Sequence, residues 1–136
     1  MIQDIFLGGP FTKHEPYDDY KIKIKSAFPD KDIFDPETQE YQKTGDWFQE
    51  NAFALENSLA LVAYIPDFPF AMVGPEVGIF YTMHDQSNFT RPLDEIIIIW
   101  PETLKPDYAK KAAAKMGYVV ENPDEAIVRL KKLFEF

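Results

Sequence analysis

Two uninterrupted apolar runs constrain the fold of this chain more than any other feature. Leu59–Ile65 and Ile96–Trp100 consist only of aliphatic and aromatic residues, with no polar residue at alternate positions. A strand of this kind is buried on both faces, which is typical of a parallel sheet covered by helices on each side. Both runs are too short to cross a bilayer, which takes about 20 apolar residues.

Weaker strand signals and helical patterns alternate with these two runs. The other predicted strands are Ile5–Gly9, Asp32–Phe34 and Tyr118–Glu121. The predicted helices are Glu15–Phe28, Gly45–Asn57, Pro75–Met83, Pro106–Met116 and a last one from Asn122-Pro123 to about Phe134. We expect Gly117 to cap the fourth helix and Pro123 to open the fifth.

Five β–α units in strict alternation predict an α/β fold. The expected architecture is a single flavodoxin-like, doubly wound domain over residues 1–136, with a five-stranded parallel sheet and helices on both faces. Ligands of such sheets bind at the carboxyl ends of the strands, near the switch in strand order. The loops Gly8–Thr12 and Pro66–Gly74 are therefore the expected binding region.

The first of these loops contains the pair Gly8-Gly9, followed by Phe11. It matches neither a P-loop nor the dinucleotide-binding glycine pattern. Paired glycines let backbone N–H groups approach a ligand closely, but a turn that only requires glycine fits these residues equally well.

Glu76 is the candidate nucleophile, because it follows Gly74 in the first turn of a predicted helix. The helix N-terminus favours the ionised carboxylate, which is the form that attacks an electrophilic carbon. On spacing alone, an acid that only stabilises its helix is the favoured interpretation. By themselves Glu50 and Asp67 are interpreted as a solvated helix residue and a turn residue.

Composition excludes several classes of function. The chain has 14 Lys and Arg residues against 23 Asp and Glu, for a net charge of −9, which disfavours a nucleic-acid polymer as partner. It has no Cys, and its two histidines are isolated, so we expect no metal site. The N-terminal residues lack the pattern of a signal peptide, and we expect a cytoplasmic protein without a membrane segment.

Three segments, taken in order, resemble the nucleoside 2-deoxyribosyltransferase family. They are Ile5–Thr12 with its glycine-aromatic loop, Trp47–Asn57 leading into the strand Leu61–Asp67, and Gly74–Phe80. The resemblance covers roughly residues 4–81. It implies a base exchange on 2′-deoxynucleosides, with a nucleoside and a free nucleobase as partners, no cofactor, and assembly into homo-oligomers.

The resemblance also implies roles for individual residues. Glu76 becomes the nucleophile that attacks C1′, and Glu50 the acid that hydrogen-bonds the base. Retention at C1′ then follows from two inversions, as in retaining glycosidases. The residues expected to bind substrate are Gly8, Gly9, Phe11, Asp67 and Gly74.

Some positions depart from the family. Phe6 stands where the family has a tyrosine that helps to hold the nucleophile, and Phe70 stands where it has an acid. Two alternatives therefore stay open: an N-glycoside hydrolase acting on deoxynucleosides or deoxynucleotides, and a non-catalytic nucleotide-binding module. The loop 68–75 lacks Ser, Thr, Arg and Lys, which favours an unphosphorylated nucleoside over a nucleotide.

The C-terminal end offers a further alternative. Leu133, Phe134 and Phe136 are apolar, and the resemblance to an oligomeric family makes them candidates for a subunit interface. The other interpretation is that they cover the chain's own core.

Overall fold

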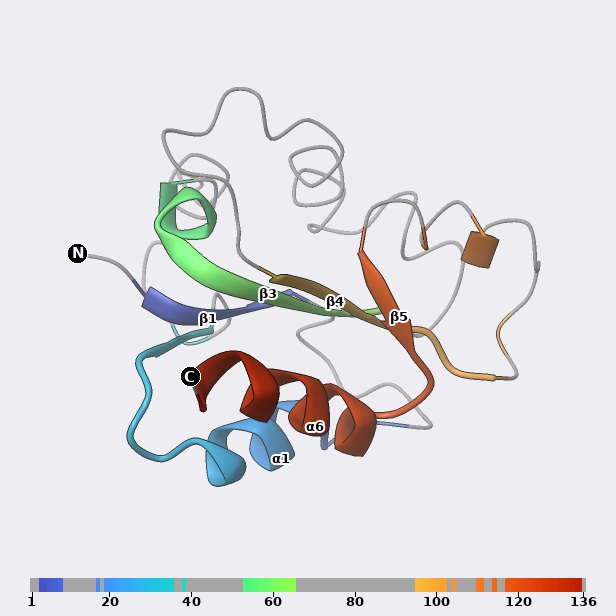
Figure 1. The fold of residues 1–136 in the computed structure, drawn as a ribbon, viewed down its shortest axis with the longest axis horizontal. Helices are drawn as coiled ribbons and strands as arrows, with labels where there is room; N and C mark the ends of the chain where they lie inside the picture. Colours follow the sequence, from blue (N-terminus) through green and yellow to red (C-terminus); the bar gives the residue numbers. More distant parts are fainter. Residues whose placement is uncertain are drawn as a thin grey trace.

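The computed structural model describes residues 3–8, 17, 19–35, 38, 53–65, 95–102, 104, 110–111, 114 and 117–135. Its framework is a five-stranded sheet in the order β2-β1-β3-β4-β5, in which every neighbouring pair is parallel (Figure 1). The strands are β1 (Gln3–Gly8), β2 (Ile33–Phe34), β3 (Ser58–Tyr64), β4 (Glu95–Ile99) and β5 (Tyr118–Val120). This sheet confirms the predicted flavodoxin-like α/β fold.

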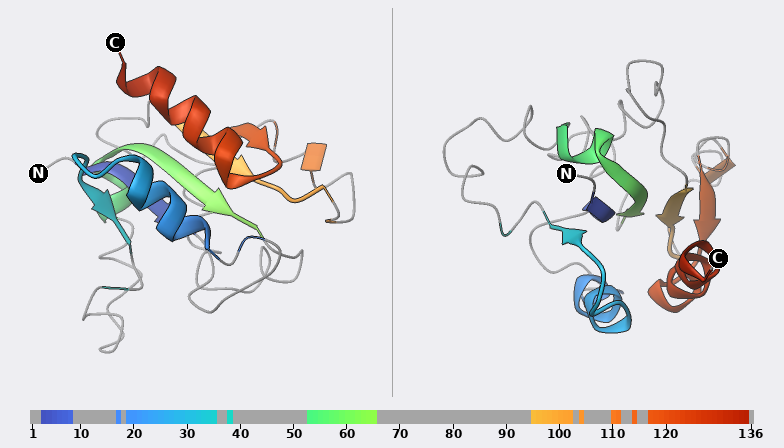
Figure 2. Two further views of the ribbon diagram at one scale, coloured as in Figure 1. Left: turned by 90° about the horizontal axis from the view of Figure 1, so that it is seen from below. Right: turned by 60° about the vertical axis from the view of Figure 1, so that its left-hand side comes forward.

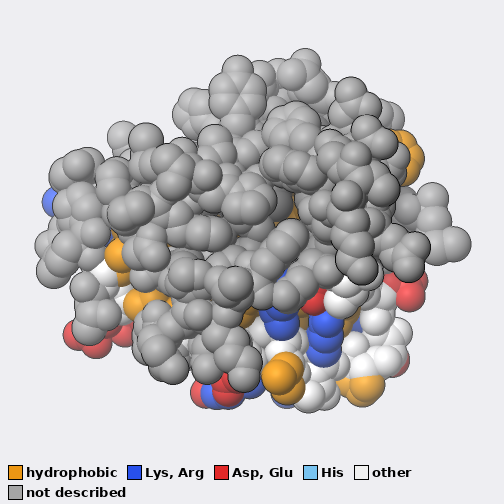
Figure 3. Space-filling view, turned by 180° about the vertical axis from the view of Figure 1, so that it is seen from behind, with side chains coloured by type: hydrophobic (Ala, Val, Ile, Leu, Met, Phe, Trp, Pro, Cys, Tyr) orange, Lys and Arg blue, Asp and Glu red, His pale blue; other side chains and the backbone are white. Residues whose placement is uncertain are grey.

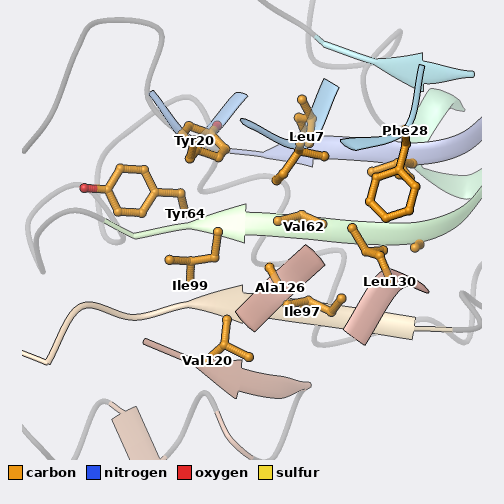
Figure 4. Packing of buried hydrophobic residues seen from close by; sticks show 13 residues of the cluster. Leu7, Tyr20, Phe28, Val62, Tyr64, Ile97, Ile99, Val120, Ala126 and Leu130 are labelled. Atoms are coloured by element: carbon orange, nitrogen blue, oxygen red, sulfur yellow. The ribbon is translucent and has the colours of Figure 1, made fainter. Parts of the chain in front are cut away.

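One face of the sheet is covered by two helices that lie side by side, α1 (Tyr20–Ala27) and α6 (Pro123–Phe134) (Figure 2). Leu7, Val62 and Ile97 point from the three central strands toward this layer (Figure 4). They pack with Ile24 of α1 and Leu130 of α6, and all five side chains are fully buried. The alternate residues of each strand face the other way, since side chains of a strand alternate between faces.

The opposite face has its own core. Phe6, Leu61 and Ile98 pack there against Ala54 and Leu55, which belong to the helical residues 53–56. Helices therefore cover both faces, as the two uninterrupted apolar runs predict. Of the other predicted helices, Pro75–Met83 lies outside the described residues, and only 110–111 of Pro106–Met116 are described as helical.

Helix α1 is shorter than the predicted range Glu15–Phe28, because it begins only at Tyr20. Tyr17 precedes the helix but still packs against its buried side, which explains why its spacing imitates a helical position. The prediction for α6 is confirmed at its N-terminus. The Asn122 side chain caps the helix by accepting a 2.9 Å hydrogen bond from the backbone N–H of Glu125, and Pro123 occupies the first turn.

Gly117 is required for space. A Cβ added there would lie 2.7 Å from both the Cγ2 and the carbonyl oxygen of Ile96 in β4. Its φ angle lies outside the left-handed region, so the left-handed cap expected from the sequence is not what selects glycine. The close approach to β4 is the reason instead.

Of the two interpretations of the C-terminal end, the structure supports the one in which Leu133 and Phe134 cover the chain's own core, because both pack against it. The Phe134 ring meets the ring of Phe28 edge-on, with 5.9 Å between centroids, and Lys31 Nζ lies 4.8 Å from its centre. The end of α6 therefore packs against the C-terminal end of α1. Phe136 lies outside the described residues.

The exposed surface of the helical layer is mixed in character. On the lower part of the molecule, where α1 and α6 lie in Figure 1, Figure 3 shows basic, acidic and hydrophobic side chains next to one another. Within the described segments, no helix is long and apolar enough to cross a membrane.

Candidate functional site

The strand order changes direction between β1 and β3. From β1 the chain continues to β2 on one side, whereas β3, β4 and β5 follow in sequence on the other side. Gly8, the last residue of β1, pairs in register with Ala63, the residue before the end of β3. The loops that follow these strands therefore leave the sheet from neighbouring points on one edge, where ligands of such folds bind.

Of the predicted site residues, the structure describes only Gly8, which is buried at the end of β1. The other predicted binding and catalytic positions lie outside the described residues: Gly9, Phe11, Glu50, Asp67, Gly74 and Glu76. The described residues thus fix the strand ends from which the predicted loops start.

Three tyrosines, Tyr17, Tyr20 and Tyr64, pack together at the carboxyl end of β3. Tyr64, the last residue of β3, is fully buried, and its hydroxyl points past the end of the strand (Figure 4). The hydroxyl accepts a 3.2 Å hydrogen bond from the backbone N–H of Tyr17. The Tyr64 ring also packs at 5.0 Å from the ring of Tyr20 and at 6.0 Å from that of Tyr17, measured between centroids. The segment entering α1 is therefore attached to the carboxyl end of β3.

Sequence reasoning placed Tyr64 in the strand-end motif and gave it no separate role. Its position as the last residue of a buried strand was the available signal. A hydroxyl at that position needs a partner, and the nearest partners are backbone groups of adjacent loops.

Phe6 lies on the opposite face of the sheet from Tyr64. It is fully buried, and its ring stacks on Phe34 of β2 with centroids 5.2 Å apart and planes 20° apart. The side chain at this position therefore contributes packing between β1 and β2. Phe70, the other departure from the family pattern, lies outside the described residues.

A partly buried charge cluster lies at the end of β2. Asp35 directly follows the strand, and its two carboxylate oxygens accept hydrogen bonds from Lys21 Nζ at 2.7 Å and Lys25 Nζ at 2.9 Å. Burial by itself raises the pKa of Asp35, but the hydrogen bonds and positive charges of the two lysines outweigh it and hold the pKa below its ordinary value. Asp35 is therefore ionised at neutral pH.

This cluster was missed by sequence reasoning, which gave no role to Asp35, the residue after the predicted strand Asp32–Phe34. The signal for it was an acid at a strand end together with two lysines spaced one helical turn apart on the preceding helix. In the described part of the chain, no group of three His, Asp or Glu side chains is arranged to hold a metal ion.

Comparison of the chain with protein-family models, with curated proteins and with solved structures finds no match. Its function is therefore inferred from its own motifs and from the geometry of its sheet.

Proposed function

We propose that this protein transfers a 2-deoxyribosyl group from one nucleobase to another, with Glu76 as the nucleophile. The proposal rests on the ordered motifs within residues 4–81 that resemble the nucleoside 2-deoxyribosyltransferase family. It places the protein among the cytoplasmic enzymes of purine and pyrimidine salvage.

The observation that supports it best is the register of β1 and β3. Gly8 pairs with Ala63, so the glycine-aromatic loop and the loop that leads to Glu76 start from adjacent strands. A parallel sheet binds small ligands at this switch point. Two of the segments that carry the resemblance therefore start at the region where the fold favours a ligand.

The proposed chemistry has two displacement steps. The Glu76 carboxylate attacks C1′ of the deoxynucleoside, the C1′–N bond breaks, and the base departs with the bonding electrons and takes a proton from Glu50. A second base then attacks C1′ through a ring nitrogen, which releases the Glu76 carboxylate and returns a proton to Glu50. Each step inverts C1′, so the product keeps the original configuration.

The experiment is chromatography of the protein with a 2′-deoxynucleoside and an excess of a different free base. We expect a new deoxynucleoside with the wild type and none with Glu76→Gln, which removes the nucleophilic charge while keeping the side-chain shape. Glu135→Gln is the matched control. Glu135 is an exposed acid at the end of α6, and its variant should keep full activity.

Two results would contradict the transferase proposal. Free base without a new nucleoside would identify a hydrolase, in which water intercepts the glycosyl-enzyme. No product with purine and pyrimidine donors and their monophosphates would instead favour the non-catalytic nucleotide-binding module, to be followed by ligand titration.

A further inference from the structure

We infer that α6 carries a self-complementary surface through which two copies of this chain associate. The surface consists of Glu125, Val128, Arg129 and Lys132, which we call the α6 stripe. These residues follow the spacing i, i+3, i+4, i+7 and therefore lie along one side of the helix. This inference is independent of the proposed function.

The α6 stripe borders a groove of about 290 Å³ between α6 and β5, the strand at one edge of the sheet order. Tyr118 of β5 and Val128 both line the groove and are 49% and 56% exposed. Among the described residues, four large hydrophobic side chains are exposed to this degree, and two of them meet here. Adjoining exposed apolar side chains with a charged rim are typical of protein interaction sites.

The groove is held in shape by contacts that cross three elements. Arg129 Nε donates a 3.1 Å hydrogen bond to the carboxylate of Glu95 in β4. The Arg129 guanidinium lies over the Tyr118 ring, 4.3 Å from its centre. An arginine fixed on a tyrosine needs little further ordering when a partner arrives, which lowers the entropic cost of association.

The charge pattern of the α6 stripe indicates that a second copy of this chain binds there. The acid Glu125 stands at one end, the cation Lys132 at the other, and Val128 and Arg129 lie at the middle. When a second α6 packs antiparallel about a two-fold axis, each Glu125 faces Lys132 of the other copy, and each Val128 packs near the axis against the Arg129 side chain of the other copy. Two copies then form two equivalent ion pairs, as an isologous interface requires.

The overall charge of −9 makes this arrangement selective. Two such acidic chains repel each other on most faces, so they associate only where cations of one copy meet acids of the other. Antiparallel packing also sets the opposite helix dipoles against each other favourably. Because α6 has only 12 residues, the contact is small, and we expect a weak, concentration-dependent dimer.

The test uses charge exchange between two separate variants. The wild type should dimerise as its concentration rises in sedimentation equilibrium, whereas Glu125→Lys and Lys132→Glu should each remain monomeric at the same concentrations. Mixing the two variants should restore a dimer, because each lysine at 125 then faces a glutamate at 132 in the other chain. A structural defect in either variant cannot produce this recovery.

A second variant tests the centre of the interface. Val128→Lys should abolish association, because it places an ammonium group against Arg129 of the other copy, while Ile22→Lys is the matched control. Ile22 is 67% exposed on α1 and lies outside the α6 stripe, so its variant should dimerise like the wild type.

Glu125 also accepts a 2.9 Å hydrogen bond from the backbone N–H of Glu121, so thermal unfolding must confirm that Glu125→Lys is folded. A wild type that is monomeric at millimolar concentration would overturn the inference. So would a mixture of the two charge variants that stays monomeric, or a Val128→Lys variant that still dimerises.

Discussion

The backbone N–H of Tyr17 donates a 3.2 Å hydrogen bond to the hydroxyl of Tyr64, which lies 47 residues further along the chain. Tyr17 stands before the first turn of α1, and Tyr64 ends β3. The bond therefore connects the segment that follows β1 with the end of the neighbouring strand. Both partners belong to the edge of the sheet at which we place the substrate.

Replacing Tyr64 with Phe removes the acceptor and keeps the buried ring. We expect the free energy of unfolding to fall by about 1 kcal/mol, the usual net contribution of such a bond. The Tyr17 amide should also exchange with solvent faster. Chemical denaturation and hydrogen exchange by NMR measure the two effects.

The control is Tyr118→Phe, because Tyr118 is half exposed and its described contact with Arg129 is made by the ring. This variant should change stability by less than about 0.5 kcal/mol. An unchanged exchange rate at Tyr17 in Tyr64→Phe would contradict the structural role of the bond.

Replacing Asp35 with Asn removes the buried carboxylate to which Lys21 and Lys25 donate hydrogen bonds. Because Asn keeps a hydrogen-bond acceptor but lacks the charge that the two ammonium groups face, we expect a loss of about 2 kcal/mol at pH 7, the usual contribution of hydrogen bonds to charged groups. The pKa of Asp35 is lowered in the folded protein, so its stabilising contribution is present above the ordinary aspartate pKa. It is lost as the pH falls through the lowered value.

The difference in unfolding free energy between wild type and Asp35→Asn should therefore be constant near neutral pH. It should shrink below about pH 4, the region of the unperturbed pKa. Denaturant titrations between pH 3 and pH 7 measure it. Asp30→Asn, an exposed acid in the same segment, should show no comparable difference. A difference for Asp35 that persists at the lowest pH would argue against the ion-pair explanation.

Replacing Gly117 with Ala should destabilise the protein, because the new methyl group would meet the Ile96 carbonyl and side chain at 2.7 Å. Overpacking of this kind costs about 1–3 kcal/mol. At a glycine with free space, the same substitution stabilises by about 0.4–1 kcal/mol through the unfolded state. The sign of the change in thermal unfolding decides between the two cases, and a stabilised variant would refute the close contact with β4.

Replacing Asn122 with Ala should cost about 1 kcal/mol, because the helix then loses the side-chain acceptor for the Glu125 N–H. Asn122→Asp is the matched control, since Asp caps equally well and its charge suits the helix N-terminus. Urea denaturation compares the three proteins. Equal stabilities of Asn122→Ala and Asn122→Asp would show that the cap contributes nothing.

Local patterns in the sequence determined the parts of the fold that depend on neighbouring residues. The apolar runs at Leu59–Ile65 and Ile96–Trp100 predicted central strands, because burial on both faces leaves no polar alternation. Likewise Asn122 and Pro123 predicted the start of α6, since an N-cap acts within a single turn. The β–α alternation alone also predicted the loops after β1 and β3 as the binding region, without the strand order.

The tertiary structure alone decided the relationships between distant residues. The attachment of Tyr17 to Tyr64, the pairing of Asp35 with Lys21 and the docking of Phe134 on Phe28 each join separate elements. No local pattern encodes such contacts, because they depend on how helices and strands pack. The same reason explains Gly117, because the close approach of β4 leaves no room for a side chain at this position. The sequence alone determined the parallel α/β fold, and packing between its layers decided which side chains anchor the edge where the proposed site lies.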